Sequence, residues 1–95
     1  KDVNVYNKIF EAVEKVPGAS NPHRVRSRMI GNRYIITLDI EVNPQITITQ
    51  AHEIAGAVEK SIESSIDNVY DILVHVEPAG ECQTDEKFGV DKDMV

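Results

Sequence analysis

The chain has 95 residues, of which 41% are hydrophobic, so it is long enough for one small globular domain with a modest core. Its formal net charge of −6 argues against nucleic-acid binding, because phosphate contacts need Lys and Arg. The single cysteine, Cys82, excludes an internal disulfide framework and is typical of a reducing compartment. No apolar run is long enough to cross a bilayer, and no signal peptide precedes the first element. Because the chain starts at Lys1, we expect either a piece of a longer protein or a processed start.

Residues 2–16 predict an amphipathic helix, since their apolar side chains recur at helical spacing and Pro17-Gly18 ends the pattern. Residues 23–30 and 33–42 predict a hairpin, with Gly31-Asn32 as its turn. The second of these strands has the clearer alternation. One of its faces carries Tyr34, Ile36, Leu38, Ile40 and Val42.

Residues 48–66 predict a second helix, with Thr47 as its N-cap and Gln50 completing a capping box. Residues 69–77 predict a third strand, which Pro78 and Gly80 stop. We expect residues 1–80 to form the folded domain. Residues 81–95 are polar, with five acids against two lysines, and are interpreted as an acidic flexible tail.

The element order αββαβ predicts an α+β fold in which two helices cover one face of a three-stranded mixed sheet. A right-handed crossover through the second helix brings the third strand back parallel, beside the second. The face that the helices leave bare then carries four polar residues. These are Asp39, Glu41, His75 and Glu77.

Imidazole and carboxylate groups gather on this predicted face. His75 and Glu77 are two residues apart on one strand and therefore share a face, and Asp39 lies on the neighbouring strand. His23 opens the first strand, and His52 lies in the first turns of the second helix. Such groups are ligands for zinc, manganese or iron(II). The spacing alone is more often that of a solvated polar face.

Other features have plain interpretations. His23 and His52 also fit surface or capping histidines, and the arginines of the first strand fit a solvated edge or ion pairs to acids on the second. His52-Glu53 does not continue into a zincin motif, because Gly56 stands where the second histidine is required. The chain has no Gly-rich phosphate loop, no Cys-x-x-Cys and no nucleophile–base pair, so we do not expect an enzyme.

Three ordered runs carry a resemblance to a known family. They are VPGASNPHRVRSR at residues 16–28, followed by Gly31; QAHEI at residues 50–54, followed by Val58-Glu59; and VHVEP at residues 74–78. In this order, over residues 5–80, the chain resembles the cytosolic C-terminal domain of cation diffusion facilitators, membrane transporters that export divalent metal ions such as zinc.

The resemblance implies a ferredoxin-like, metallochaperone-like fold and a V-shaped homodimer at the cytoplasmic face of the cell membrane. It also implies a transmembrane domain in the same chain and metal sites at or near the dimer interface. The resemblance therefore implies that the domain binds metal and regulates transport, while the transport site lies in the membrane part.

Carried over by position, His23 matches a ligand histidine before the arginine-rich strand, and His75 matches a ligand that bridges two metal ions. His52 matches a helix histidine that reaches a metal held mainly by the partner subunit. Glu77 stands where relatives use Asp. Asp39 departs from the pattern, since many relatives have His there, and this harder ligand leaves manganese or iron(II) open beside zinc.

The function predicted from the sequence is therefore a cytosolic regulatory domain of a divalent metal efflux transporter, which binds metal ions and mediates homodimerisation. Two alternatives stay open: a stand-alone metallochaperone-like carrier, and a purely structural dimerisation module. The missing Cys-x-x-Cys argues against a carrier for soft metals. The sequence upstream of Lys1 separates the transporter domain from the carrier, and metal titration separates it from the structural module.

Overall fold

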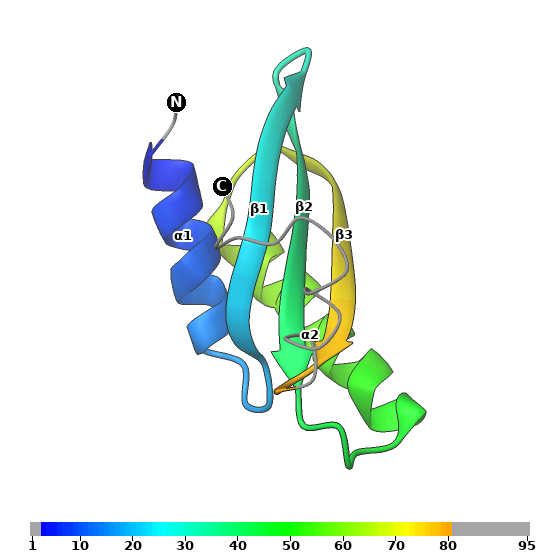
Figure 1. Cartoon of the computed structure of the whole chain (residues 1–95). Coiled ribbons are helices and arrows are strands. Elements are labelled where there is room, and N and C mark those ends of the chain that lie inside the picture. Colours follow the sequence, from blue (N-terminus) through cyan, green and yellow to red (C-terminus); the bar gives the residue numbers. More distant parts are fainter. Residues whose placement is uncertain (1–2, 81–95) are drawn as a thin grey trace, which may run out of the picture.

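The computed structural model describes residues 3–80, which form two helices and three strands in the predicted order (Figure 1). The elements are α1 (Val3–Glu14), β1 (Ser20–Ile30), β2 (Arg33–Val42), α2 (Ile48–Ser65) and β3 (Val69–Pro78). Only the start of β1 differs from the expected bounds by more than two residues. The proposed acidic tail, residues 81–95, lies outside the described residues.

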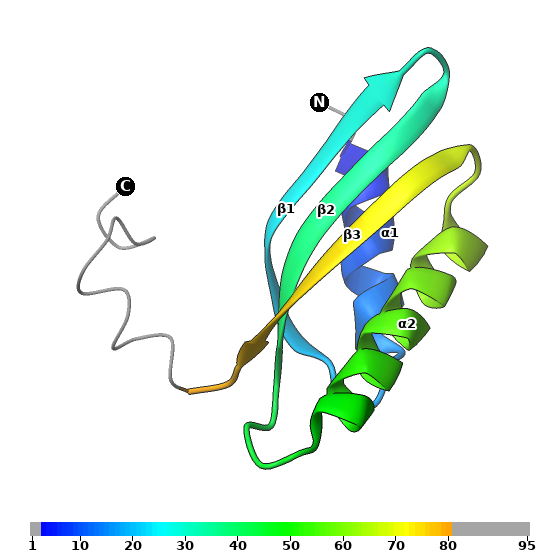
Figure 2. The ribbon, with the colours of Figure 1, turned by 90° about the vertical axis from the view of Figure 1, so that its right-hand side faces the viewer.

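The sheet has the order β1-β2-β3, with β2 antiparallel to β1 and parallel to β3. Both helices lie on the same side of the sheet, and no other helix or strand of residues 3–80 covers the opposite side (Figure 2). The predicted α+β, ferredoxin-like architecture is confirmed. Because β2 is the central strand, its residues have neighbours on both sides. The polar residues on its uncovered face are therefore the best placed to contact polar side chains of both β1 and β3.

The core lies between the helices and the sheet, and the period of each element explains it. The inward face of β2 and one stripe of each helix supply side chains that are almost fully shielded from solvent. The largest of them are Ile9, Ile36, Leu38, Ile40, Ile62, Val13 and Val58. None is aromatic, so aliphatic packing holds the layers together.

Local sequence signals determine the connections. Gly31 turns the β1–β2 hairpin with φ +60°, and Gly18 has φ +93° where the loop after α1 approaches α2. A Cβ at Gly18 would lie 2.8 Å from Ile54 Cδ1, so only glycine fits there without a shift. The capping box of α2 is confirmed, because Thr47 Oγ1 accepts from Gln50 N and Gln50 Oε1 accepts from Thr47 N.

Strand β1 is irregular at its beginning. Its pairing with β2 shifts register twice, between Ser20 and His23 and again between His23 and Arg26, so each shift adds one residue to β1. Asn21 and Arg24 have φ +48° and +49°, in the left-handed region that residues with a Cβ rarely adopt. Two bulges of this kind re-aim the side chains around them. Neither helix within residues 3–80 is long and apolar enough to cross a membrane.

Candidate metal centre

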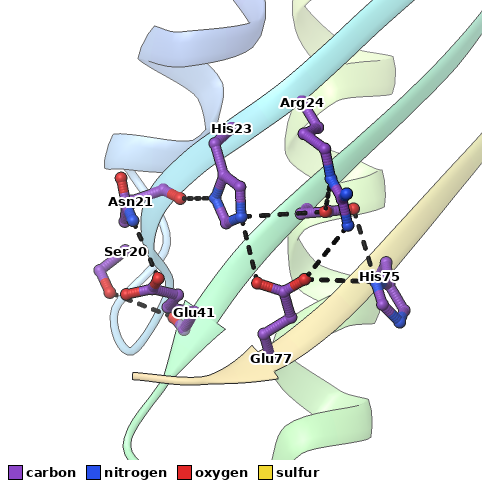
Figure 3. Close-up of polar contacts among 8 residues, drawn as sticks. Ser20, Asn21, His23, Arg24, Glu41, His75 and Glu77 are labelled. Atoms are coloured by element: carbon purple, nitrogen blue, oxygen red, sulfur yellow. Dashed lines mark hydrogen bonds and ion pairs between the residues drawn. The ribbon is translucent and has the colours of Figure 1, made fainter. Parts of the chain in front are cut away.

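The register of the central strand with β3 places acidic and imidazole side chains on one patch of the uncovered face. Asp39 pairs with His75, and Glu41 pairs with Glu77, in the parallel ladder between β2 and β3. These residues alternate with the buried aliphatic residues of both strands, so they point away from the helices. The patch lies where β2 and β3 approach their C-terminal ends (Figure 3).

The bulges of β1 bring two further side chains to the same patch. Strict alternation would direct His23 and Arg24 to opposite faces of the sheet. With one extra residue inserted on either side of it, His23 pairs with Asp39, and Arg24 also reaches that carboxylate. Both side chains therefore contact Asp39 on the uncovered face. Both also contact Glu77, as Figure 3 shows.

His23, Asp39 and Glu77 form the tightest set, and each offers one ligand atom within 4.8 Å of the others. His23 Nε2 lies 3.1 Å from Glu77 Oε1 and 3.8 Å from Asp39 Oδ2. His75 stands beside them, with its Nδ1 3.5 Å from Asp39 Oδ1 and 3.7 Å from Glu77 Oε2. Four of the five sequence-predicted ligands are thus brought together.

The hydrogen bonds of His23 define which ring nitrogen faces the carboxylates. Its Nδ1 lies 2.7 Å from the backbone oxygen of Asn21, and because a carbonyl only accepts, Nδ1–H is the donor. In a neutral imidazole, Nε2 then carries a lone pair, yet it points at Glu77 Oε1. Only a proton or a metal ion on Nε2 makes that contact attractive. Metal-binding histidines commonly donate their second N–H to a backbone carbonyl in this way.

The acids of the central strand are more deeply buried than a solvated face predicts. Asp39 is only 7% exposed and Glu41 9%, because side chains of β1 and β3 flank them on both sides. Glu41 Oε2 accepts a hydrogen bond from Asn21 Nδ2, which ties the first bulge to β2. A solvated polar face, the plain interpretation of the His75 and Glu77 spacing, therefore does not describe Asp39 and Glu41.

Arg24 supplies the positive charge that partly offsets these acids. Its Nε donates to Asp39 Oδ2 at 2.7 Å, and its Nη2 lies 3.5 Å from Glu77 Oε2. The hydrogen bond and charge of Asp39 raise the pKa of the Arg24 guanidinium. The expected ion pair between an arginine of the first strand and Asp39 is confirmed.

His52, the fifth predicted ligand, is not part of this patch. It is exposed on α2, in the layer on the other side of the sheet. Its role as a ligand to a metal held mainly by a partner subunit stays a prediction from the family resemblance. The residue that sequence reasoning did not count as part of the site is Arg24, and the arginine-rich strand next to His23 was the signal for it.

Comparisons with known proteins show the family of the chain. Residues 2–79 match the family described as cation efflux protein, cytoplasmic domain, and the chain belongs to this family. The structure is similar to the metal-bound C-terminal domain of the CzcD transporter from Thermotoga maritima, with a TM-score of 0.80 and 38% identity, covering 84% of this chain and 93% of that one.

Two curated relatives are similar in sequence. The magnetosome protein MamM of Magnetospirillum gryphiswaldense is 36% identical over 73 residues, which cover 77% of this chain and 23% of MamM. The manganese efflux system protein MneS of Bacillus subtilis is 30% identical over 80 residues, which cover 82% of this chain and 26% of MneS. The chain thus spans about a quarter of the length of these relatives.

Proposed function

We propose that this chain is the regulatory domain of a divalent metal efflux transporter and that it binds a metal ion through His23, Asp39 and Glu77, with His75 as an additional ligand. The observation that carries the proposal is the His23 imidazole, held by Asn21 so that Nε2 faces two carboxylates. A divalent cation at that point would attract both the lone pair of His23 Nε2 and the carboxylate of Glu77, which otherwise repel each other. It would also neutralise the negative charges of Asp39 and Glu77.

The ligand set favours a first-row divalent metal of intermediate hardness. One or two imidazoles with two carboxylates suit zinc, and they also suit manganese and iron(II). The metal-bound CzcD domain supports metal binding here, and the name of MneS supports manganese as one candidate. Zinc is the probe of choice, since such sites bind it more tightly than manganese.

Calorimetric titration of the domain with zinc and with manganese tests the proposal. We expect saturable binding of both ions, tighter for zinc, and at least about tenfold weaker zinc binding in His23→Ala, the scale for loss of one supporting metal contact. His52→Ala is the matched control, because it removes an exposed imidazole that lies outside the patch. Absence of zinc binding by the wild-type domain would leave the purely structural role.

We also propose that the domain forms a homodimer in which the uncovered face of the sheet and the C-terminal half of the fold take part. That face combines the acidic patch with apolar groups, including Leu73, which is 65% exposed, and the half-buried Ile35. Two such faces repel each other through Asp39 and Glu77, and a bound cation offsets the repulsion. Metal binding would then draw the two subunits together and report the metal level to the membrane domain of the transporter.

Sedimentation of the domain at several concentrations, with and without zinc, measures this association. Leu73→Ser should weaken the dimer by at least about tenfold, because burial of a leucine side chain contributes about 1.5–3 kcal/mol. Ile48→Ser is the control, since Ile48 is 89% exposed at the start of α2, away from the sheet face. A strict monomer at every concentration, with and without zinc, would contradict the proposed dimer.

A further inference from the structure

The guanidinium of Arg24 lies at the point where a bound cation would be needed. It bridges the two carboxylates of the patch, with Nε 2.7 Å from Asp39 Oδ2 and Nη2 3.5 Å from Glu77 Oε2 (Figure 3). Those side chains are only 11% and 18% exposed, so their charges need a nearby counter-ion. The Arg24 side chain is itself 64% exposed, so little packing opposes its movement into water.

Charge balance at the patch decides between a guanidinium and a metal ion. Asp39 and Glu77 together carry two negative charges, and Arg24 neutralises one of them. A divalent cation neutralises both. If Arg24 kept its present position, its positive charge would then be in excess and would repel the metal ion. At the separations found in such a site, like charges repel by several times the thermal energy unless water intervenes. The two cations therefore compete for the same carboxylates.

The backbone of β1 adopts an unfavourable conformation at Arg24, and this conformation places Arg24 at the patch. Arg24 has φ +49° at the second bulge, a conformation that costs free energy for a residue with a Cβ. The bulge directs Arg24 to the same carboxylate as its neighbour His23, where an ordinary strand would separate them. The strain is offset by the charge-assisted hydrogen bond to Asp39.

We propose that Arg24 is a built-in competitor of the metal ion: it neutralises Asp39 and Glu77 while the site holds no metal, and it must leave when a divalent cation binds. Its contribution sets the metal concentration at which the site fills. This inference rests on the proposed function, because it concerns the same ligands. A rival role is equally concrete: Arg24 could instead position Asp39 and remain beside the bound metal, in which case its loss would weaken binding.

Arg24→Gln separates these roles, because Gln is polar and neutral and keeps the first three carbons of the arginine side chain. We expect zinc affinity to rise by about tenfold, the scale of one charge-assisted hydrogen bond discounted for exposure. We also expect the melting temperature without metal to fall, and the melting temperature at saturating zinc to equal or exceed that of the wild type. A positioning role would lower both melting temperatures and weaken zinc binding.

Arg26→Gln is the matched control. Arg26 is exposed on the same strand and has the same charge, and within residues 3–80 it forms no ion pair with the patch. It should change zinc affinity by less than about twofold in 0.15 M salt, where exposed charges are screened beyond about 8 Å. Equal effects of the two variants on zinc affinity would show that the change in net charge alone causes them, and this would overturn the inference.

The outcomes also separate this inference from the proposed function. If the wild type binds no zinc and Arg24→Gln binds none either, the metal site itself is wrong and the competition is wrong with it. If the wild type binds zinc and Arg24→Gln binds it equally or more weakly, the metal site stands and the competition alone is overturned.

Discussion

Asp39→Asn should lower the affinity of the domain for zinc by about 100-fold, which corresponds to about 2.7 kcal/mol. Asp39 is the common partner of the patch, because its carboxylate contacts His23, Arg24 and His75. The substitution keeps the shape of the side chain and removes the negative charge that would attract a divalent cation. Calorimetric titration with zinc measures the change.

The same substitution should have a small effect on the protein without metal. It weakens the ion pair to Arg24, but it also removes the repulsion between Asp39 and Glu77. Asp71→Asn is the control: it makes the same charge change on the uncovered face, at an exposed position about 13 Å along β3 from His75. Similar zinc affinities in the two variants would show that Asp39 is not a ligand.

The fold was predictable because its signals are local and repeat along each element. The alternation of β2 and the stripe of α1 define the core-facing residues directly, and Ile9 and Ile36 are both fully buried as expected. Thr47 with Gln50 marks the start of α2 to the residue. The parallel pairing of β2 with β3 then follows from the handedness of the crossover.

The site was only partly predictable, because two of its residues depend on the bulges of β1. Alternation read back from Val25 directs His23 toward the core, and nothing in the spacing shows that one extra residue is inserted on each side of it. Only the family resemblance selected His23 as a ligand. The left-handed conformations of Asn21 and Arg24 have no strong sequence signal, since neither residue is glycine.

Burial of the acids was the other feature that the sequence could not show. Period-two alternation says which face Asp39 and Glu41 occupy, but not how closely the neighbouring strands cover them. Asp39 is contacted by long side chains that cross over from β1 and β3, such as Arg24 and His75, and Glu41 is contacted by Asn21 of β1. The shifted register of β1 with β2 had to be known before that cover was apparent.

Ile62→Ala should strongly destabilise the domain without metal, and zinc should restore part of the lost stability. Ile62 is fully buried in α2, and truncation of a buried isoleucine costs about 2–5 kcal/mol. The 78 described residues correspond to a total stability of roughly 4–12 kcal/mol at ordinary values per residue. Zinc at 100 times its dissociation constant returns about 2.7 kcal/mol, because it binds the folded form.

Urea unfolding followed by circular dichroism, at one fixed protein concentration, measures this linkage. The urea midpoint of Ile62→Ala should rise with zinc and fall again when a chelator is added. The control is the double variant Ile62→Ala/Asp39→Asn, which has the same core defect and a disabled patch. Ile62 and Asp39 lie on opposite sides of the sheet, so their effects without metal should add. An equal zinc shift in both variants would place the stabilising metal outside the patch of His23, Asp39 and Glu77.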